Sequence, residues 1–196
     1  MLAFIDVRAG GAPNESAGTR LSPFLERLRA AGRAEVRLER RRFDPVEGAE
    51  RVTRGRAALE PPAFARLDFA GGESVTLRSD GGEWLEPALR QLVQLGPDRA
   101  RGALGWCDLL LDDRSGAITR RDLADGRLLW VRNEADAADS AWITLDTRGQ
   151  PASLAYREGL GEIERVQLSH WTFARARGRG AFVLAAPSGY EVVELP

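Results

Sequence analysis

The chain lacks lysine, and it has little cysteine, little histidine and no long hydrophobic run. It contains 28 basic residues, all of them arginine, against 29 acidic residues, so its formal net charge is −1. A near-neutral charge argues against a nucleic-acid binder whose affinity comes from neutralising phosphates. One cysteine excludes an internal disulfide, and one histidine excludes a histidine-rich metal site. No run reaches the roughly 20 apolar residues of a membrane-spanning helix. We therefore expect no metal, no cofactor and no nucleic-acid partner.

Length and composition predict one domain preceded by a loose arm. The chain has 196 residues, enough for a single hydrophobic core. Residues 1–20 are small, polar and rich in turn formers, so we expect a flexible arm there, followed by one domain over residues 21–196. The domain should begin with a short amphipathic helix in which Ser22 is the N-cap and Gly32 the C-cap.

Short runs of alternating apolar and polar residues dominate the rest of the chain. The clearest lie in residues 54–87, where turns are marked by Pro61-Pro62, Gly71-Gly72 and Gly81-Gly82. Such strands have one apolar face, which must lie against packed side chains or a ligand. The whole pattern predicts a mainly β (α+β) fold, in which about eleven strands form a single antiparallel sheet curled on itself, with an N-terminal and a mid-chain helix.

Two segments allow more than one interpretation. Residues 87–95 fit a helix or a strand, with propensity favouring the helix. Residues 99–111 fit a helix that contains the most apolar stretch of the chain, Trp106 to Leu111. This helix is either part of the core, which its periodicity favours, or a lid over a cavity.

Other motifs have simpler explanations than function. The run Arg40-Arg41-Arg42 is best explained as a solvated strand end, and RARGRG at residues 175–180 as a surface loop. Cys107 and His170 are the one possible nucleophile pair, but no orienting motif accompanies them and no recognisable pair of carboxylates is present. We therefore expect no catalytic residues and no enzyme activity.

The order of these features resembles a known family. Five segments between roughly residues 21 and 195 carry the resemblance: SPFLERLRAAG, RGRAALEPPAFARLDF, SVTLRSDGGEWLEP, ITLDTRGQPASLAYRE and FVLAAPSGYEVVEL. No single motif is specific, but the collinear set is similar to the periplasmic lipoprotein carriers of the LolA type.

The resemblance implies both a fold and a function. The fold is an incomplete antiparallel β-barrel, closed by a few helices, with an internal apolar cavity; residues 87–93 then form a strand and residues 97–111 part of the lid. The function is that of a monomeric periplasmic carrier, its signal peptide removed, which binds lipoprotein acyl chains. It would shuttle them from an inner-membrane release complex to an outer-membrane acceptor. The alternative is a LolA-like binding or sensor protein for another lipid or hydrophobic ligand.

The apolar residues that alternation turns inward are the candidates to line this cavity. Each acyl methylene held out of water is worth about 0.8 kcal/mol, so a carrier needs a large dry surface. For every candidate the alternative is ordinary core packing. The candidates on strands are Val36, Leu38, Leu59, Leu67, Phe69, Val75, Leu77, Trp84, Leu129, Val131, Trp142 and Leu145, and those that would close the mouth are Trp106, Leu109 and Leu110.

The chain departs from the family at one position. Members commonly carry an arginine directly before the proline of the first meander, where it is thought to hold the lid by hydrogen bonding. Here Pro61 occupies the matching position and Glu60 precedes it. The resemblance therefore does not extend to this arginine latch, for which Arg54, Arg56 or Arg66 would have to substitute.

Overall fold

The fold is seen in a computed structural model that describes residues 20–44, 48–97, 99–100, 105–111, 118–133, 138–157 and 163–196. The arm predicted over residues 1–20 lies outside this part of the chain except for Arg20. None of the described helices is long and apolar enough to cross a membrane.

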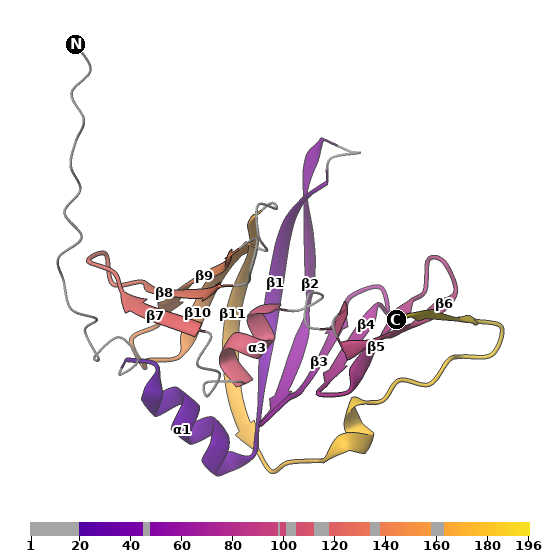
Figure 1. The fold of residues 1–196 in the computed structure, drawn as a ribbon, viewed down its shortest axis with the longest axis horizontal. Helices are drawn as coiled ribbons and strands as arrows, with labels where there is room; N and C mark the ends of the chain where they lie inside the picture. The colour runs from indigo at the N-terminus through magenta and orange to yellow at the C-terminus, as the bar shows by residue number, and fades with distance from the viewer. Residues whose placement is uncertain are drawn as a thin grey trace.

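Twelve strands form one sheet that curls without closing into a barrel (Figure 1). The sheet order is β12-β6-β5-β4-β3-β2-β1-β11-β10-β9-β8-β7, so β12 and β7 form its two edges. The predicted mainly β fold, an incomplete barrel with covering helices, is confirmed. The elements are α1 (Ser22–Ala31), β1 (Arg33–Asp44), β2 (Ala49–Glu60), β3 (Phe64–Phe69), β4 (Ser74–Arg78), β5 (Gly81–Glu86), β6 (Gln91–Leu95), α3 (Gly105–Leu111), β7 (Ile118–Asp122), β8 (Leu128–Asn133), β9 (Ala138–Leu145), β10 (Pro151–Arg157), β11 (Ile163–Ala174), η1 (Arg179–Phe182) and β12 (Glu191–Leu195).

Alternation along the strands gives the sheet an apolar inner face, which we define as the face covered by α1 and α3. In β1, Ala34, Val36 and Leu38 are all buried on this face. Its neighbour β2 pairs antiparallel with it, and the register places Ala57 opposite Val36. The two helices and the inward residues of the strands form a single hydrophobic cluster.

Helix α1 packs on the inner face through one apolar side. Phe24 meets the ring of Trp171 edge-on, with 4.8 Å between the ring centroids. Gly32 ends the helix as predicted, with a φ of 90° and its N–H donating to the carbonyl of Leu28. The predicted N-cap was wrong by one residue. Leu21 is the cap and Ser22 is already helical, so the proline that follows lies within the first turn, where its missing N–H costs no hydrogen bond.

The C-terminal strap, residues 175–190, crosses the outer face of β3, β4 and β5 and was not predicted. Phe182 is buried there and stacks on Phe64, with 5.4 Å between ring centroids. Arg78 holds the strap by donating to the carbonyl of Phe182 at 2.8 Å. Residues 181–184 form no strand, because they belong partly to the short helix η1 and otherwise to irregular backbone.

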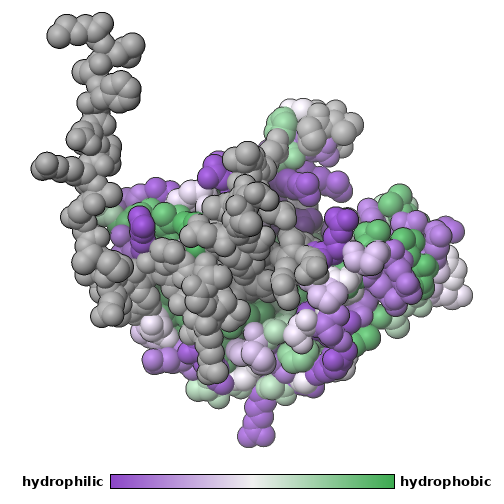
Figure 2. Space-filling view, viewed as in Figure 1, coloured by the Kyte–Doolittle hydropathy of each residue, from purple (hydrophilic) through white to green (hydrophobic). Residues whose placement is uncertain are grey.

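The strap carries the chain to the far edge of the sheet. There β12 pairs with β6 in parallel, the one departure from the antiparallel arrangement among the described strands. The segment at 87–95 is a strand only from Gln91, which follows a turn that contains Arg90 at a φ of 53°. Hydrophobic residues gather at this edge in Figure 2, and Val192 and Leu195 are exposed there.

Candidate functional site

The inner face of the sheet is the candidate ligand-binding surface. Most of the predicted cavity residues lie on it and belong to one cluster. The fully buried ones are Val36, Leu38, Leu59, Leu67, Phe69, Val75 and Leu77 on the strands, and Trp106 and Leu110 on α3. Trp84 and Leu145 are partly buried and pack against the same cluster. The side chain of Leu109 lies outside the described part of the chain.

Three predicted cavity residues point the other way. Leu129, Val131 and Trp142 are half-buried and do not belong to the cluster, so their assignment to the inner face was wrong. Leu129 and Trp142 are cross-strand partners on the outer face. The guanidinium of Arg157 lies 5.8 Å from the ring centroid of Trp142, which keeps that ring at a polar surface.

The inner face of the second half of the sheet is formed by residues that the sequence prediction missed. Leu128 and Trp130 occupy it in β8, opposite Ile143 and Ala141 of β9. Strands β10 and β11 continue it with Leu154, Tyr156, Val166 and Leu168. Odd- and even-numbered residues of β8 are both largely apolar, so alternation alone does not show which set faces inward. The pairing with β9 decides it.

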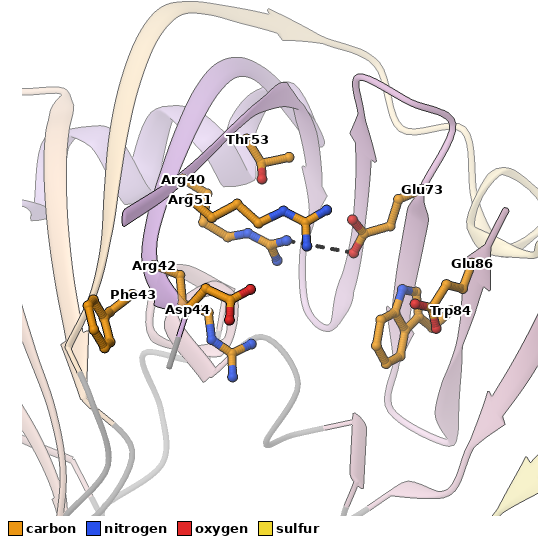
Figure 3. A pocket seen from close by; sticks show the side chains of 9 residues that line it. All are labelled: Arg40, Arg42, Phe43, Asp44, Arg51, Thr53, Glu73, Trp84 and Glu86. Carbon is orange, nitrogen blue, oxygen red and sulfur yellow. Dashed lines mark ion pairs between the residues drawn. The ribbon is translucent and has the colours of Figure 1, made fainter. Parts of the chain in front are cut away.

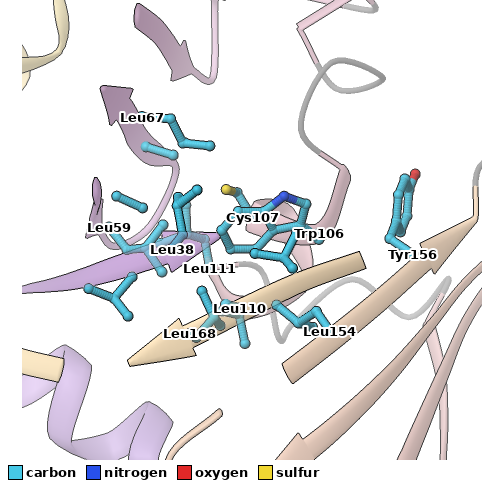
Figure 4. Packing of buried hydrophobic residues seen from close by; sticks show 14 of the residues in the cluster. Leu38, Leu59, Leu67, Trp106, Cys107, Leu110, Leu111, Leu154, Tyr156 and Leu168 are labelled. Carbon is cyan, nitrogen blue, oxygen red and sulfur yellow. The ribbon is translucent and has the colours of Figure 1, made fainter. Parts of the chain in front are cut away.

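Helix α3 covers the middle of the inner face. Figure 4 shows Trp106 and Leu110 reaching from the helix to the leucines of β1, β2 and β11. Trp106 is only 1% exposed, and its indole N–H has no hydrogen-bond partner among the described residues. An unpaired buried donor costs about 1–3 kcal/mol, which a ligand carbonyl or carboxylate would recover. The helix thus covers an apolar surface and holds a polar group that a ligand can satisfy.

A polar pocket of about 370 Å³ opens at one end of the inner face. Figure 3 shows its side chains converging from the β1–β2 hairpin on one side and from β5 on the other. Arg40 is engaged in two contacts, an ion pair with Glu73 at 3.6 Å and a cation–π contact with Phe69 at 4.3 Å. The lining residues are Arg40, Arg42, Phe43, Asp44, Arg51, Thr53, Glu73, Trp84 and Glu86.

One further carboxyl group lies on the inner side of this charged region. Glu164 lies two residues before Val166 on β11, so its side chain points to the same face as that of Val166, which belongs to the cluster. Burial raises the pKa of Glu164, and the nearby Arg40 and Arg42 oppose that rise. Its Oε1 atom has no hydrogen-bond partner among the described residues. The charged end of the inner face thus contains a carboxyl that gains a proton more readily than usual.

Glu60, the residue before the position of the missing arginine latch, forms a tether of a different kind. Glu60 is 3% exposed and accepts hydrogen bonds from the backbone N–H groups of Arg177 at 2.8 Å and Gly178 at 2.9 Å. Residues 54, 56 and 66 alternate with the buried residues of β2 and β3, so all three candidate substitutes lie on the outer face. None of them can hold α3, and the proposed substitution was wrong.

The described residues supply no catalytic arrangement around Cys107. The side chain of this cysteine is fully buried on α3, whereas the side chain of His170 is exposed on β11. A fully buried thiol is shielded from any substrate that approaches from water. Within the described ranges, no three acidic, histidine or cysteine side chains are grouped so that they could hold a metal ion.

Comparisons with known proteins show similarity of fold. No protein-family model matches the chain, and no curated protein matches it. An uncharacterized conserved protein from Thermus thermophilus is 16% identical and superposes with a TM-score of 0.52 over 92% of this chain and 100% of its own. A LolA superfamily protein from Nitrosomonas europaea is 13% identical, with a TM-score of 0.47 over 86% of this chain and 97% of its own.

A putative outer membrane lipoprotein-sorting protein domain from Vibrio parahaemolyticus is 10% identical, with a TM-score of 0.43 over 85% of this chain and 97% of its own. The chain therefore shares its fold with the Thermus protein.

Proposed function

We propose that this protein is a non-catalytic carrier that binds acyl chains on the inner face of its sheet, beneath α3. The observation that carries the proposal is that the short helix α3 covers the middle of the apolar inner face. An open, curled sheet presents a continuous apolar face, and a helix of seven residues closes its centre through Trp106, Leu110 and Leu111. A short cover of this kind can be displaced without breaking the strand pairing that defines the fold.

The energetics of exchange support this arrangement. The inner-face side chains and those of α3 pack in one cluster, so a ligand beneath α3 must replace the contacts of this helix with its own. Withdrawing a large apolar side chain from the core costs about 1.5–3 kcal/mol. An acyl chain of about ten methylenes gains about 8 kcal/mol when it leaves water, at about 0.8 kcal/mol each. Withdrawal of the three apolar side chains of α3 costs a comparable sum, so acyl chains can be taken up and released.

The specific version of the proposal follows the sequence resemblance to LolA-type carriers. The cargo would be the acyl chains of a lipoprotein, and the protein would work in the periplasm between an inner-membrane release complex and an outer-membrane acceptor. Pro61 stands where that family has its arginine latch, and the neighbouring Glu60 instead tethers the C-terminal strap on the outer face. Release from this chain would therefore be controlled by the packing of α3 and not by that latch.

Quenching by a brominated fatty acid tests where an acyl chain binds. Bromine quenches tryptophan on contact, and 9,10-dibromostearic acid carries it in the middle of the chain. Trp106 faces the inner cluster, whereas Trp142 lies on the outer face, so the two form a matched pair. We expect saturable quenching that W106F reduces and W142F leaves unchanged. Absence of saturable quenching, or quenching that only W142F reduces, would contradict the proposal.

A further inference from the structure

The inner face changes from apolar to basic along the β1–β2 hairpin. Val36 and Leu38 belong to the apolar cluster, but the next residues of the same parity in β1 are Arg40 and Arg42. Figure 2 shows hydrophilic side chains near the tip of this hairpin. A molecule lying along the inner face would thus meet apolar side chains over most of its length and arginines at one end.

Two of the pocket arginines form no ion pair or hydrogen bond with any described residue. Arg42 and Arg51 are direct cross-strand partners, and both line the pocket. The neighbouring Arg40, by contrast, is paired with Glu73, and among the described residues Arg42 is attracted to the carboxyl group of Glu164. Like charges placed directly opposite each other on a sheet destabilise it, and an anion between them would reverse that effect.

The opposite wall of the pocket contains Trp84 and Glu86 (Figure 3). The ring of Trp84 packs against the apolar cluster, so the pocket and the inner face are continuous. Its indole N–H is buried and has no hydrogen-bond partner among the described residues. A volume of about 370 Å³ lies within the range of small-molecule sites, which runs from about 300 to 1,000 Å³.

We propose that Arg42 and Arg51 bind the oxyanion of an acyl lipid whose chain runs past Trp84 onto the inner face. The guanidinium groups can each donate two parallel hydrogen bonds to a carboxylate or a phosphate. This inference rests on the proposed function, because it needs the acyl chain to occupy the inner face. It adds the class of ligand, an anionic amphiphile with its charge at the hairpin end. It therefore favours a carrier of another lipid, because the ester- and amide-linked acyl chains of a lipoprotein carry no oxyanion.

Competition among three amphiphiles of equal chain length tests this assignment. Dodecanoate, dodecyl phosphate and dodecanol would each displace the neutral probe N-phenyl-1-naphthylamine from the protein at pH 8. We expect one or both anions to bind roughly tenfold or more tightly than dodecanol, the size of about one charge-assisted hydrogen bond. Preference for both anions indicates a general oxyanion site, and preference for one identifies its source as a carboxylate or a phosphate.

Variants of Arg42 and Arg51, compared with a control on the outer face, test whether these two arginines cause the preference for anions. R42Q/R51Q should abolish the preference for the anions while leaving the affinity for dodecanol unchanged. The matched control is R54Q, because Arg54 lies on the outer face and pairs with Glu39 at 2.9 Å; it should retain the full preference. Thermal unfolding of each variant checks that the double substitution leaves the fold intact, as removal of two like charges predicts.

The outcomes separate this inference from the proposed function. Equal affinity for dodecanol and both anions, or a preference that survives R42Q/R51Q, would overturn the oxyanion site and leave the acyl carrier standing. Failure of the protein to bind the neutral probe or dodecanol at all would instead overturn the carrier.

Discussion

The carboxylate of Glu60 accepts a hydrogen bond of 2.9 Å from the backbone N–H of Gly178, joining the end of β2 to the segment that leaves β11. Arg177 donates a second one at 2.8 Å. The two ends of this tether are far apart in sequence, and a buried carboxylate that satisfies two backbone donors at once fixes the start of the C-terminal strap. The strap lies over the outer face of β3, β4 and β5, whereas α1 and α3 cover the inner face.

Removal of this carboxylate should destabilise the protein. E60A leaves two backbone donors without their acceptor, so we expect the free energy of unfolding to fall by about 1–3 kcal/mol. Urea denaturation measures this as a lower midpoint with an unchanged slope. E50A is the control, since Glu50 is exposed and pairs with Arg41 at 3.5 Å, and it should change stability by less than about 0.5 kcal/mol. Equal effects of the two variants would show that Glu60 is not a tether.

The strap should detach when its buried aromatic residue is removed. Phe182 is 1% exposed and stacks on Phe64, so F182A should cost about 3–5 kcal/mol. It should also speed cleavage by trypsin after Arg179. Phe43 offers a matched control, because it is 46% exposed near the tip of the hairpin and F43A should have little effect. An F182A protein as stable and as protease-resistant as F43A would contradict this account.

A buried acid makes the attachment of the strap depend on pH. Burial alone would raise the pKa of Glu83, but hydrogen bonds from Arg78 at 2.5 Å and Thr76 at 2.7 Å outweigh it and leave the pKa below its usual value. Glu83 also accepts from the N–H of Leu184. Since the folded pKa is lower than the unfolded one, the stabilisation is complete above the unfolded pKa of about 4.3 and is lost as the pH falls through the folded pKa.

The variant E83Q keeps the shape of the side chain and removes its titration. We expect wild type to be more stable than E83Q at pH 6 and the difference to shrink as the pH falls below about 4. Denaturation curves of both proteins across this range measure it. A difference that stays constant, or that grows in acid, would mean that the charge of Glu83 does not stabilise the fold.

The pairing of β11 with β1 shifts register between Glu35 and Arg37, which marks a β-bulge in β11. Glycine substitutions at two neighbouring residues of this bulge should change stability in opposite directions. His170 has a φ of 58°, in the left-handed region that glycine adopts without penalty. H170G should therefore stabilise the protein by up to about 1 kcal/mol, whereas S169G, at a residue with no such φ, should destabilise it by about 0.5–1 kcal/mol. Chemical denaturation of the two variants distinguishes them, and two changes of the same sign would argue against the bulge.

The same bulge shows why sequence could predict the strands but not every face. Strict alternation along β11 would place Val166, Leu168 and His170 on one side of the strand. The register shift opposite residues 35–37 moves Trp171 and Phe173 onto that side instead, where both pack against the first helix. No glycine or proline marks the bulge, so the sequence contains no local signal for it.

The strap was beyond prediction for a different reason. Its attachments to Glu60, Arg78 and Glu83 join residues about a hundred positions apart, and nothing in residues 175–190 specifies those partners. The first meander, by contrast, was predicted well. Its glycine and proline turns are local signals, and each of its strands has only one apolar face.

Lipid content measured on the purified protein tests the central claim most directly. The protein would be expressed in a bacterium, purified without detergent and analysed by native mass spectrometry, and an organic extract of the same sample would be analysed for lipids. The acyl-carrier account predicts an added mass that matches an acyl lipid in the extract, and loss of that mass on displacement with 9,10-dibromostearic acid. The acyl-carrier account would be contradicted by a protein that is detected only at its bare mass, yields no acyl lipid on extraction and shows no saturable quenching by the brominated acid.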